Sequence, residues 1–337
     1  MRRQDEPVIL VAVDAGGTRT RASIVQNSFE STGVGLAGRG NPVSGGADAA
    51  FAEIAAAIGR AAAAAGVSLA EVDAVTLASA GGAAFEEGFL AQALAGIGIT
   101  APCARKGDLA ALFASGTHET SGYSLVAGTG ATAVRIVGNV EVQTIDGLGW
   151  LLGDTGSGFW IGHQVARAVA SALDGRTSTS MVGPALEVLG IEPDLALRAS
   201  RPVASHELIR VVYTQSPFVL AALAPVAFLD DHDEVSSGIV EAAAHGLAQA
   251  VIDVHSDDVQ GPLVLGGGVM AGQPRLRERT MAALTAAGLS LPVIDAADGL
   301  VGASVLGLRD AGVTVDAAAF ETVRSATAAQ LVRATAR

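Results

Sequence analysis

Near its start the chain reads Val8-Ile9-Leu10-Val11-Ala12-Val13-Asp14-Ala15-Gly16-Gly17-Thr18-Arg19-Thr20-Arg21-Ala22-Ser23-Ile24-Val25. Residues 8–13 are almost wholly apolar and rich in β-branched side chains, which is typical of a strand buried on both faces. Gly16 and Gly17 tolerate positive φ and let a ligand approach backbone N–H groups closely. The segment therefore predicts a strand, a glycine turn and a second strand.

The polar residues of this segment suit a nucleotide. Asp14 stands at the strand end, and Thr18 and Thr20 add hydroxyl donors. A nest of N–H groups attracts phosphate, and a neighbouring carboxylate is a ligand for the Mg²⁺ that accompanies it. A single turn of this kind is more often only a hairpin, so the interpretation depends on whether similar turns recur later in the chain.

Two further glycine turns follow apolar strands, Gly128-Thr129-Gly130 after residues 123–127 and Gly266-Gly267-Gly268 after residues 262–265. The strand, glycine–threonine turn and strand unit recurs after about 110 residues, which indicates a duplicated fold and not a short tandem repeat. Two threonine turns that face each other are suited to the β- and γ-phosphates, and the triple glycine to an adenine or ribose lying on the backbone. Three such turns favour nucleotide binding over ordinary α/β turns.

Composition bounds the class of protein. The chain has 337 residues, enough for two domains, and a net charge of −13 with no basic block, which argues against nucleic-acid or anionic-membrane partners. Cys103 is the single cysteine, so no internal disulfide or cysteine metal cluster can form, and a reducing, cytoplasmic setting is expected. We expect no membrane span and no signal peptide. Lys106, the one lysine, is not in a G-x-x-x-x-G-K-[ST] motif, so no P-loop is predicted.

Strands and helices alternate along the chain, which predicts a layered α/β fold. Further strands are expected over residues 32–40, 72–78, 131–137, 140–145 and 291–294, with a short segment near 99–105. Helices are expected over residues 47–65, 85–94, from 107–108 onward, and over 157–173, 235–255, 274–287, 299–308 and 316–336, with several short helices between 174 and 233. Gly66 is predicted to end the first helix.

Three polar residues each allow two interpretations. Asp108 follows Gly107 at the head of a predicted helix, where an aspartate is usually an N-cap but is also placed to act as a general base. Asp154 either caps the next helix, as Thr155 also could, or accepts hydrogen bonds from sugar hydroxyls. Asn41 suits its turn, and it could also bind a hydroxyl or an amide. The acidic run 230–234 is interpreted as a solvated loop and not as a metal cluster.

These residues resemble a known family. Residues 14–20 resemble the first phosphate motif of the sugar kinase/Hsp70/actin superfamily, residues 127–131 its second phosphate motif, and residues 265–269 its adenosine motif. Residues 40–42, 107–111 and above all 153–162 resemble the N-acetylglucosamine kinases of the BadF/BadG/BcrA/BcrD ATPase group. The resemblance covers about residues 8–310.

The resemblance implies an α/β fold of two actin-like ATPase (ribonuclease H-like) domains with a cleft between them. It implies domains at 1–110, with a helix at 315–337 packing back, and at 111–314, with a helical elaboration at about 174–233. It implies an ATP- and Mg²⁺-dependent kinase that phosphorylates N-acetylglucosamine at O6 and is able to form a homodimer. The implied site is Asp108 as general base and sugar ligand; Asp14 at Mg²⁺; Gly16, Gly17, Thr18, Thr20, Gly128, Thr129, Gly130, Gly266, Gly267 and Gly268 at ATP; and Asn41, Gly147, Leu148, Gly149 and Asp154 at the sugar.

Two departures from the family pattern leave other sugars open. Thr155 replaces the usual glutamate after Asp154, and Leu148 replaces a common tryptophan, with Trp150 two places on. Glucosamine and N-acetylmuramic acid are therefore alternative substrates. The alternatives of another class are an ATPase activator subunit, which needs two cysteines per chain for a shared iron–sulfur cluster, and a non-catalytic sugar-binding regulator, whose DNA-binding helix pair would precede the first strand. A zinc-bearing glucokinase needs a cysteine cluster that this sequence lacks.

Overall fold

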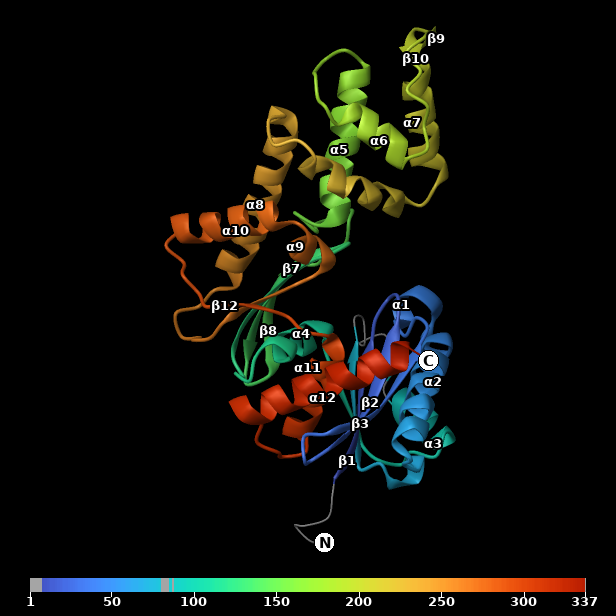
Figure 1. Cartoon of the computed structure of the whole chain (residues 1–337), viewed down its shortest axis with the longest axis vertical. Coiled ribbons are helices and arrows are strands. Elements are labelled where there is room, and N and C mark those ends of the chain that lie inside the picture. Colours follow the sequence, from blue (N-terminus) through green and yellow to red (C-terminus); the bar gives the residue numbers. More distant parts are fainter. Residues whose placement is uncertain (1–7, 80–84, 87, 337) are drawn as a thin grey trace.

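The computed structural model describes residues 8–79, 85, 86 and 88–336 (Figure 1). It contains two five-stranded mixed sheets. The first has the order β3-β2-β1-β4-β5 and consists of β1 (Ile9–Ala15), β2 (Thr20–Gln26), β3 (Ser31–Ala37), β4 (Ala74–Ser79) and β5 (Cys103–Lys106). The second has the order β8-β7-β6-β11-β12 and consists of β6 (Gly122–Ala127), β7 (Ala131–Val137), β8 (Val140–Asp146), β11 (Leu263–Gly266) and β12 (Val293–Asp295).

The two sheets have the same topology. In each, the first three strands are antiparallel, and the first strand pairs in parallel with the fourth, which pairs in parallel with the fifth. The predicted duplication is therefore confirmed, and with it the predicted class of two actin-like α/β domains. The division at residues 110 and 111 stays a prediction.

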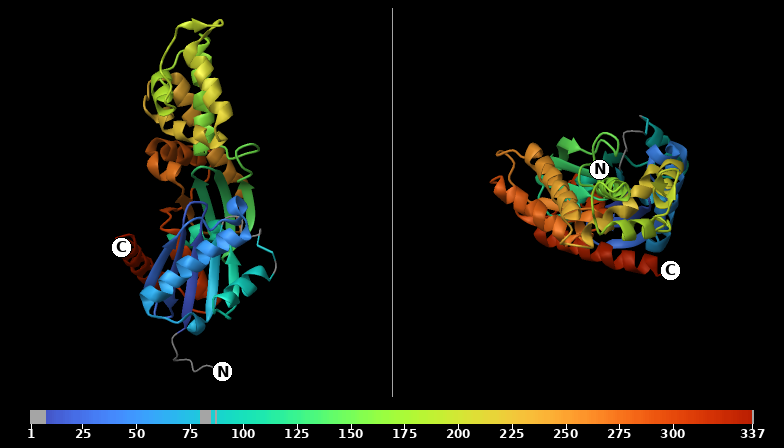
Figure 2. Two further views of the ribbon diagram at one scale, coloured as in Figure 1. Left: turned by 90° about the vertical axis from the view of Figure 1, so that its right-hand side faces the viewer. Right: turned by 90° about the horizontal axis from the view of Figure 1, so that it is seen from above.

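Helices cover both faces of the first sheet, as the apolar strand β1 predicts. Residues 11, 13 and 15 of β1 share a core with α2 (Ala47–Ala65) and α3 (Phe89–Gly96), whereas residues 10 and 12 share one with α11 (Gly299–Asp310) and α12 (Ala317–Thr335). Figure 2 shows α2 and α12 on opposite sides of this sheet. Gly66 ends α2 in the left-handed conformation with φ 68°, as predicted.

Two helices join the sheets. α4 (Asp108–Gly116) packs on β6 and β11 of the second sheet, α11 packs on β1 and β4 of the first, and the two helices pack against each other. Their core contains Phe113 of α4, Val305 of α11 and Ile136 of β7. The crossing is so close that a Cβ on Gly302 would lie 1.7 Å from the carbonyl oxygen of Ala111. Glycine is required at residue 302 for this reason.

The remaining helices surround the second sheet and extend beyond it (upper part of Figure 1). They are α5 (Gly158–Leu173), α6 (Val182–Val188), α7 (Val203–Thr214), the 3₁₀ segment η3 (Pro217–Phe228), α8 (Glu234–Val254), α9 (Gly268–Gly272) and α10 (Pro274–Ala286). The segment 174–233 is helical as predicted, and it also holds an unpredicted two-stranded hairpin, β9 (Leu197–Arg198) with β10 (Arg201–Pro202). In the first domain, α1 (Pro42–Gly45) and η1 (Leu69–Glu71) are single turns.

Three predictions need correction. The helix expected from residue 85 begins at Phe89, because Gly88 takes the left-handed conformation and serves as its N-cap. Ser157, and not Asp154 or Thr155, caps α5, since its hydroxyl accepts the N–H of Trp160 at 3.0 Å. Among the described residues, one helix, α8, is long and apolar enough to cross a membrane by length and composition, contrary to expectation; its apolar face lies in the core of the second domain.

The crossing of α4 and α11 yields the first prediction. Gly302→Ala should lower the free energy of unfolding by about 1–3 kcal/mol or more, because the added methyl group overlaps the backbone of α4. Denaturant unfolding followed by circular dichroism measures the change. Gly238→Ala in α8 is the matched control: its Cβ meets nothing within 4 Å, so the variant should gain about 0.5–1 kcal/mol. Equal unfolding midpoints for the two variants would contradict the close crossing.

Candidate active site at the start of α4

The first glycine turn is closed by its own backbone and leaves its middle exposed. The N–H of Gly16 donates to the carbonyl of Arg19 at 3.0 Å, and Gly17 and Thr18 are exposed. Neither glycine has positive φ, so these positions are not set by a left-handed backbone. At Gly17 a Cβ would meet nothing within 4 Å, which leaves room for a ligand at the backbone.

Thr20 differs from the expectation that it contacts phosphate. It is fully buried, and its hydroxyl donates to the carbonyl of Gly38 at 2.8 Å. The N–H of Gly40 in turn donates to the carbonyl of Gly16 at 3.2 Å. These bonds place Asn41, the next residue, beside the first glycine turn, where it lines a pocket of about 300 Å³ with Arg39 and Glu53.

Asp14 is held in a chain of charged groups. Its carboxylate accepts from Arg21 at 2.5 Å, and the same guanidinium donates to Asp298 at 2.6 Å. Asp298 also caps α11 by accepting the N–H of Leu300 at 2.9 Å. A Cβ on Gly299 would lie 2.7 Å from the Asp14 carboxylate, so the start of α11 approaches it closely. Burial raises the pKa of Asp14, Arg21 opposes the rise, and the charges of Asp298 and Asp108 add to it.

Asp108 is the first residue of α4, and its N-cap is Gly107. The residue is exposed by surface area, yet the protein around its carboxylate raises its pKa by desolvation, and the N–H groups of Asp108 and Leu109 partly offset the rise. The charge of Asp108 also raises the pKa of Asp14, so the two carboxylates are close enough to interact. This combination is typical of a functional acid or base.

The second and third glycine turns meet at the ends of two paired strands. β6 and β11 are parallel neighbours, with Val126 opposite Gly266. Gly267 has φ 94°, and a Cβ there would lie 2.3 Å from the carbonyl oxygen of Ala127. The carbonyl of Gly128 accepts the N–H of Gly158 at 2.7 Å, which places the start of α5 on the second turn. Thr129, between the two glycines of that turn, is exposed.

Asp154 lies behind the second turn. A Cβ on Gly130 would lie 3.0 Å from its carboxylate, and the N–H groups of Ala131 and Gly149 face the carboxylate and oppose the rise in pKa that burial causes. The N–H of Asp154 donates to Asp146 at 2.5 Å. Asp154 therefore connects the second glycine turn with the loop after β8. Its contact with sugar stays a prediction.

The loop 147–153 is exposed and apolar. Leu148, Leu151 and Leu152 are 66%, 75% and 77% exposed. Gly147 and Gly149 have φ of 71° and 84°, which explains glycine at both positions. Exposed apolar groups beside a polar site suit contact with the apolar face of a ligand or with the opposite domain.

No group of three or more His, Cys, Asp or Glu side chains within the described ranges could hold a metal ion alone. Mg²⁺ is commonly held by one or two carboxylates together with substrate phosphates. Asp14, with Asp108 and Asp298 nearby and Arg21 bonded to two of these carboxylates, supplies oxygen donors of this kind. The residues therefore fit the ion, provided that a nucleotide supplies the other ligands.

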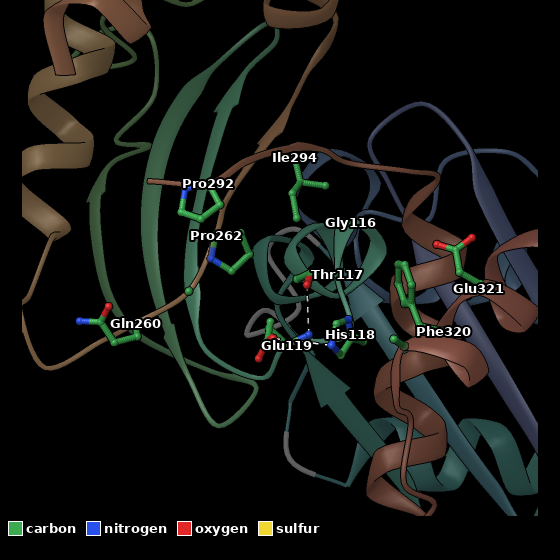
Figure 3. A pocket seen from close by; sticks show the side chains of 12 residues that line it. Gly116, Thr117, His118, Glu119, Gln260, Pro262, Pro292, Ile294, Phe320 and Glu321 are labelled. Carbon is green, nitrogen blue, oxygen red and sulfur yellow. Dashed lines mark hydrogen bonds and ion pairs between the residues drawn. The ribbon is translucent and has the colours of Figure 1, made fainter. Parts of the chain in front are cut away.

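A larger pocket, of about 490 Å³, lies at the opposite end of α4 from Asp108 (Figure 3). Its lining includes Gly116, His118, Pro262, Ile294 and Phe320. None of the predicted site residues lines it. The candidate site is thus defined by the glycine turns and carboxylates and not by this pocket.

The sequence analysis missed Arg21 and Asp298. Arg21 lies directly opposite Asp14 in the register of β1 and β2. The predicted strand–turn–strand unit could therefore have indicated that the two side chains are neighbours. Asp298 precedes a glycine and an apolar helix, which is a recognisable N-cap signal. Their joint contact depends on the tertiary fold and has no local signal.

Comparisons with known proteins agree with the two-domain fold. The model of the BadF/BadG/BcrA/BcrD ATPase family matches residues 11–307. A search of the curated proteins found no match. Among solved structures, the chain is similar to a proposed N-acetylglucosamine kinase from Chromobacterium violaceum, with 19% identity over 89% of this chain and 98% of that one and a TM-score of 0.68. It is also similar to a proposed N-acetylglucosamine kinase from Porphyromonas gingivalis, with 20% identity over 91% of this chain and 100% of that one and a TM-score of 0.65. A third similar structure is a ROK family glucokinase from Streptomyces griseus in complex with glucose and AMPPNP. It has 16% identity over 89% of this chain and 99% of that one and a TM-score of 0.53. At these identities the likeness establishes the fold.

The charged chain around Asp14 yields the second prediction. Arg21→Gln should lower the free energy of unfolding by about 1–3 kcal/mol at pH 8, because two close carboxylates lose their shared cation. The loss should shrink as pH falls, since protonation removes the repulsion. That recovery begins at a higher pH than for an exposed aspartate, because the pKa of Asp14 is raised. Denaturant unfolding at several pH values measures it.

Asp298→Asn provides the control, because asparagine caps a helix as well as aspartate does. The double variant Arg21→Gln/Asp298→Asn should lose less stability than the sum of the single variants, since one of the repelling charges is gone. Strict additivity would show that Arg21 does not bridge the two carboxylates.

Proposed function

The chain belongs to the BadF/BadG/BcrA/BcrD ATPase family, and from this premise we propose that it is an ATP-dependent amino-sugar kinase acting on N-acetylglucosamine. The observation that carries the proposal is Asp108: an accessible, desolvated carboxylate at the start of a helix, grouped with Asp14. The two proposed N-acetylglucosamine kinases, which share the fold over almost their whole length, support the substrate.

The three glycine turns would bind the nucleotide. Residues 16–18 and 128–130 offer backbone N–H groups and the exposed hydroxyls of Thr18 and Thr129 to the phosphates. Residues 266–268 would receive the adenosine, since Gly267 lets the third turn pack directly against Ala127, next to the second turn. Asp14 would hold Mg²⁺, which when bound neutralises charge that develops on the phosphates.

Asp108 would act on the sugar. The O6 hydroxyl forms a bond to the γ-phosphorus as the bond from that phosphorus to the bridging oxygen of ADP breaks. The proton of O6 passes to the Asp108 carboxylate and then to water. Such a base contributes about 10²- to 10⁴-fold to the rate. Closing the two domains over the sugar would exclude water as a competing acceptor.

The choice among amino sugars rests on residues 41 and 147–154. Asn41 stands on one domain and the loop 147–149 on the other, so a sugar between them would contact both. Thr155 packs against α8, where a Cβ on Gly246 would lie 2.3 Å from its methyl group. Threonine in place of the family's glutamate at residue 155 therefore affects the packing on α8. Leu148, which replaces the family's tryptophan, is exposed and is better placed to contact the substrate.

An activator subunit is a weaker alternative. Burial raises the pKa of the Cys103 thiol to about 11, which disfavours the thiolate that an iron–sulfur cluster requires. A cytoplasmic location and a homodimer accompany the proposal as predictions.

The proposal predicts sugar-dependent release of ADP. With Mg-ATP, N-acetylglucosamine should raise the rate of ADP release far above glucosamine, N-acetylmannosamine, N-acetylmuramic acid, glucose and no sugar, as measured by a coupled assay. The control is Asp108→Asn, which should lower kcat by about 10²- to 10⁴-fold while ATP still binds. A preference for glucosamine would redirect the proposal to that sugar. A rate that no sugar increases, in a chain that binds ATP, would reject the kinase in favour of an uncoupled ATPase or a regulator.

A further inference from the structure

The start of α4 is capped from the other domain. The N-cap residue Gly107 has no side chain to satisfy the first N–H groups of the helix. Glu141, on β8 of the second sheet, supplies the acceptor: its carboxylate receives the N–H of Ala110 at 2.8 Å. A carboxylate at a helix N-terminus also interacts favourably with the helix dipole.

Gly107 and Glu141 fit each other closely. A Cβ on Gly107 would lie 2.0 Å from one carboxylate oxygen of Glu141 and 2.7 Å from the other. The Glu141 side chain is therefore seated against the backbone of the residue directly before Asp108. Gly107 does not have positive φ, so a side chain there would disturb the seat of Glu141 and not the backbone conformation.

The first N–H groups of α4 are divided between two carboxylates. Those of Asp108 and Leu109 act on the Asp108 carboxylate, whereas that of Ala110 is bound by Glu141. With the N–H of Ala110 paired to Glu141, the Asp108 carboxylate accepts from the first two N–H groups and has lone pairs left for an incoming hydroxyl.

β8 connects this cap to the loop at the other side of the candidate site. Glu141 stands near its beginning and Asp146 at its end, about 17 Å apart along an extended strand. Asp146 binds the N–H groups of Asp154 and Thr155 at 2.5 and 2.9 Å. One strand therefore fixes both the helix that carries Asp108 and the loop 147–155.

We propose that Glu141 is a positioning residue, which acts through its hydrogen bond to Ala110 to hold Asp108 in place for proton transfer. This inference rests on the proposed function, since it takes Asp108 as the base. Because Glu141 acts through the backbone of α4, its contribution should appear in kcat and not in the binding of ATP.

The test compares two substitutions at residue 141. Glu141→Ala should lower kcat for N-acetylglucosamine by about ten- to a hundredfold with little change in KM for ATP, because a misplaced base loses rate steeply. Glu141→Gln keeps an acceptor oxygen at the same reach and should retain kcat within about threefold. Gln143→Ala, on the same strand but bonded to the carbonyl of Asp253, is the matched control and should leave kcat unchanged.

Hydrogen exchange separates this inference from the proposed function. The amide of Ala110 should exchange faster in Glu141→Ala and remain protected in Glu141→Gln, whether or not the chain phosphorylates a sugar. Unchanged protection in Glu141→Ala would overturn the capping contact. Unchanged kcat in Glu141→Ala, or an equal loss in both variants, would overturn the positioning role, whereas a wild-type chain without sugar-dependent turnover would reject the proposed function itself.

Discussion

The close crossing of α4 and α11 is the contact on which the site depends. Because Gly302 lies against the carbonyl of Ala111, the two helices meet backbone to backbone, each packed on a different sheet. Their first residues, Asp108 and Gly299, both lie near Asp14. Two positive helix ends and Arg21 thus offset carboxylates that would otherwise repel one another. Burial nevertheless raises the pKa of Asp14 and that of Asp108, as expected at a site built to receive a cation or a proton.

The sequence allowed most of the architecture to be predicted because its signals were local. The β-branched run of β1, the glycine turns and the two copies of the strand–turn–strand unit predicted the duplicated sheets. The misses have physical causes. Thr20 had an available hydroxyl, but burial turned it toward Gly38. Ser157 displaced Asp154 as a cap because Asp154 is held at Gly130. The contact of Glu141 with α4 joins strands and helices distant in sequence and leaves no periodic pattern.

The candidate site is divided between the two domains in a way that suits a transfer reaction. The first turn, Asp14 and Asn41 belong to the first sheet, and the second and third turns with the loop 147–154 belong to the second. Asp108 stands on the helix between them, held by Glu141 from one side and near Asp14 on the other. A phosphoryl donor and an acceptor that each contact both domains would therefore meet beside Asp108.

The most direct measurement is phosphorus-31 NMR of the chain with Mg-ATP and N-acetylglucosamine, because it separates transfer from hydrolysis. The account predicts a phosphomonoester signal coupled to the two protons on C6 of the sugar, growing in step with ADP. Inorganic phosphate growing in step with ADP, with no phosphomonoester formed, would contradict it.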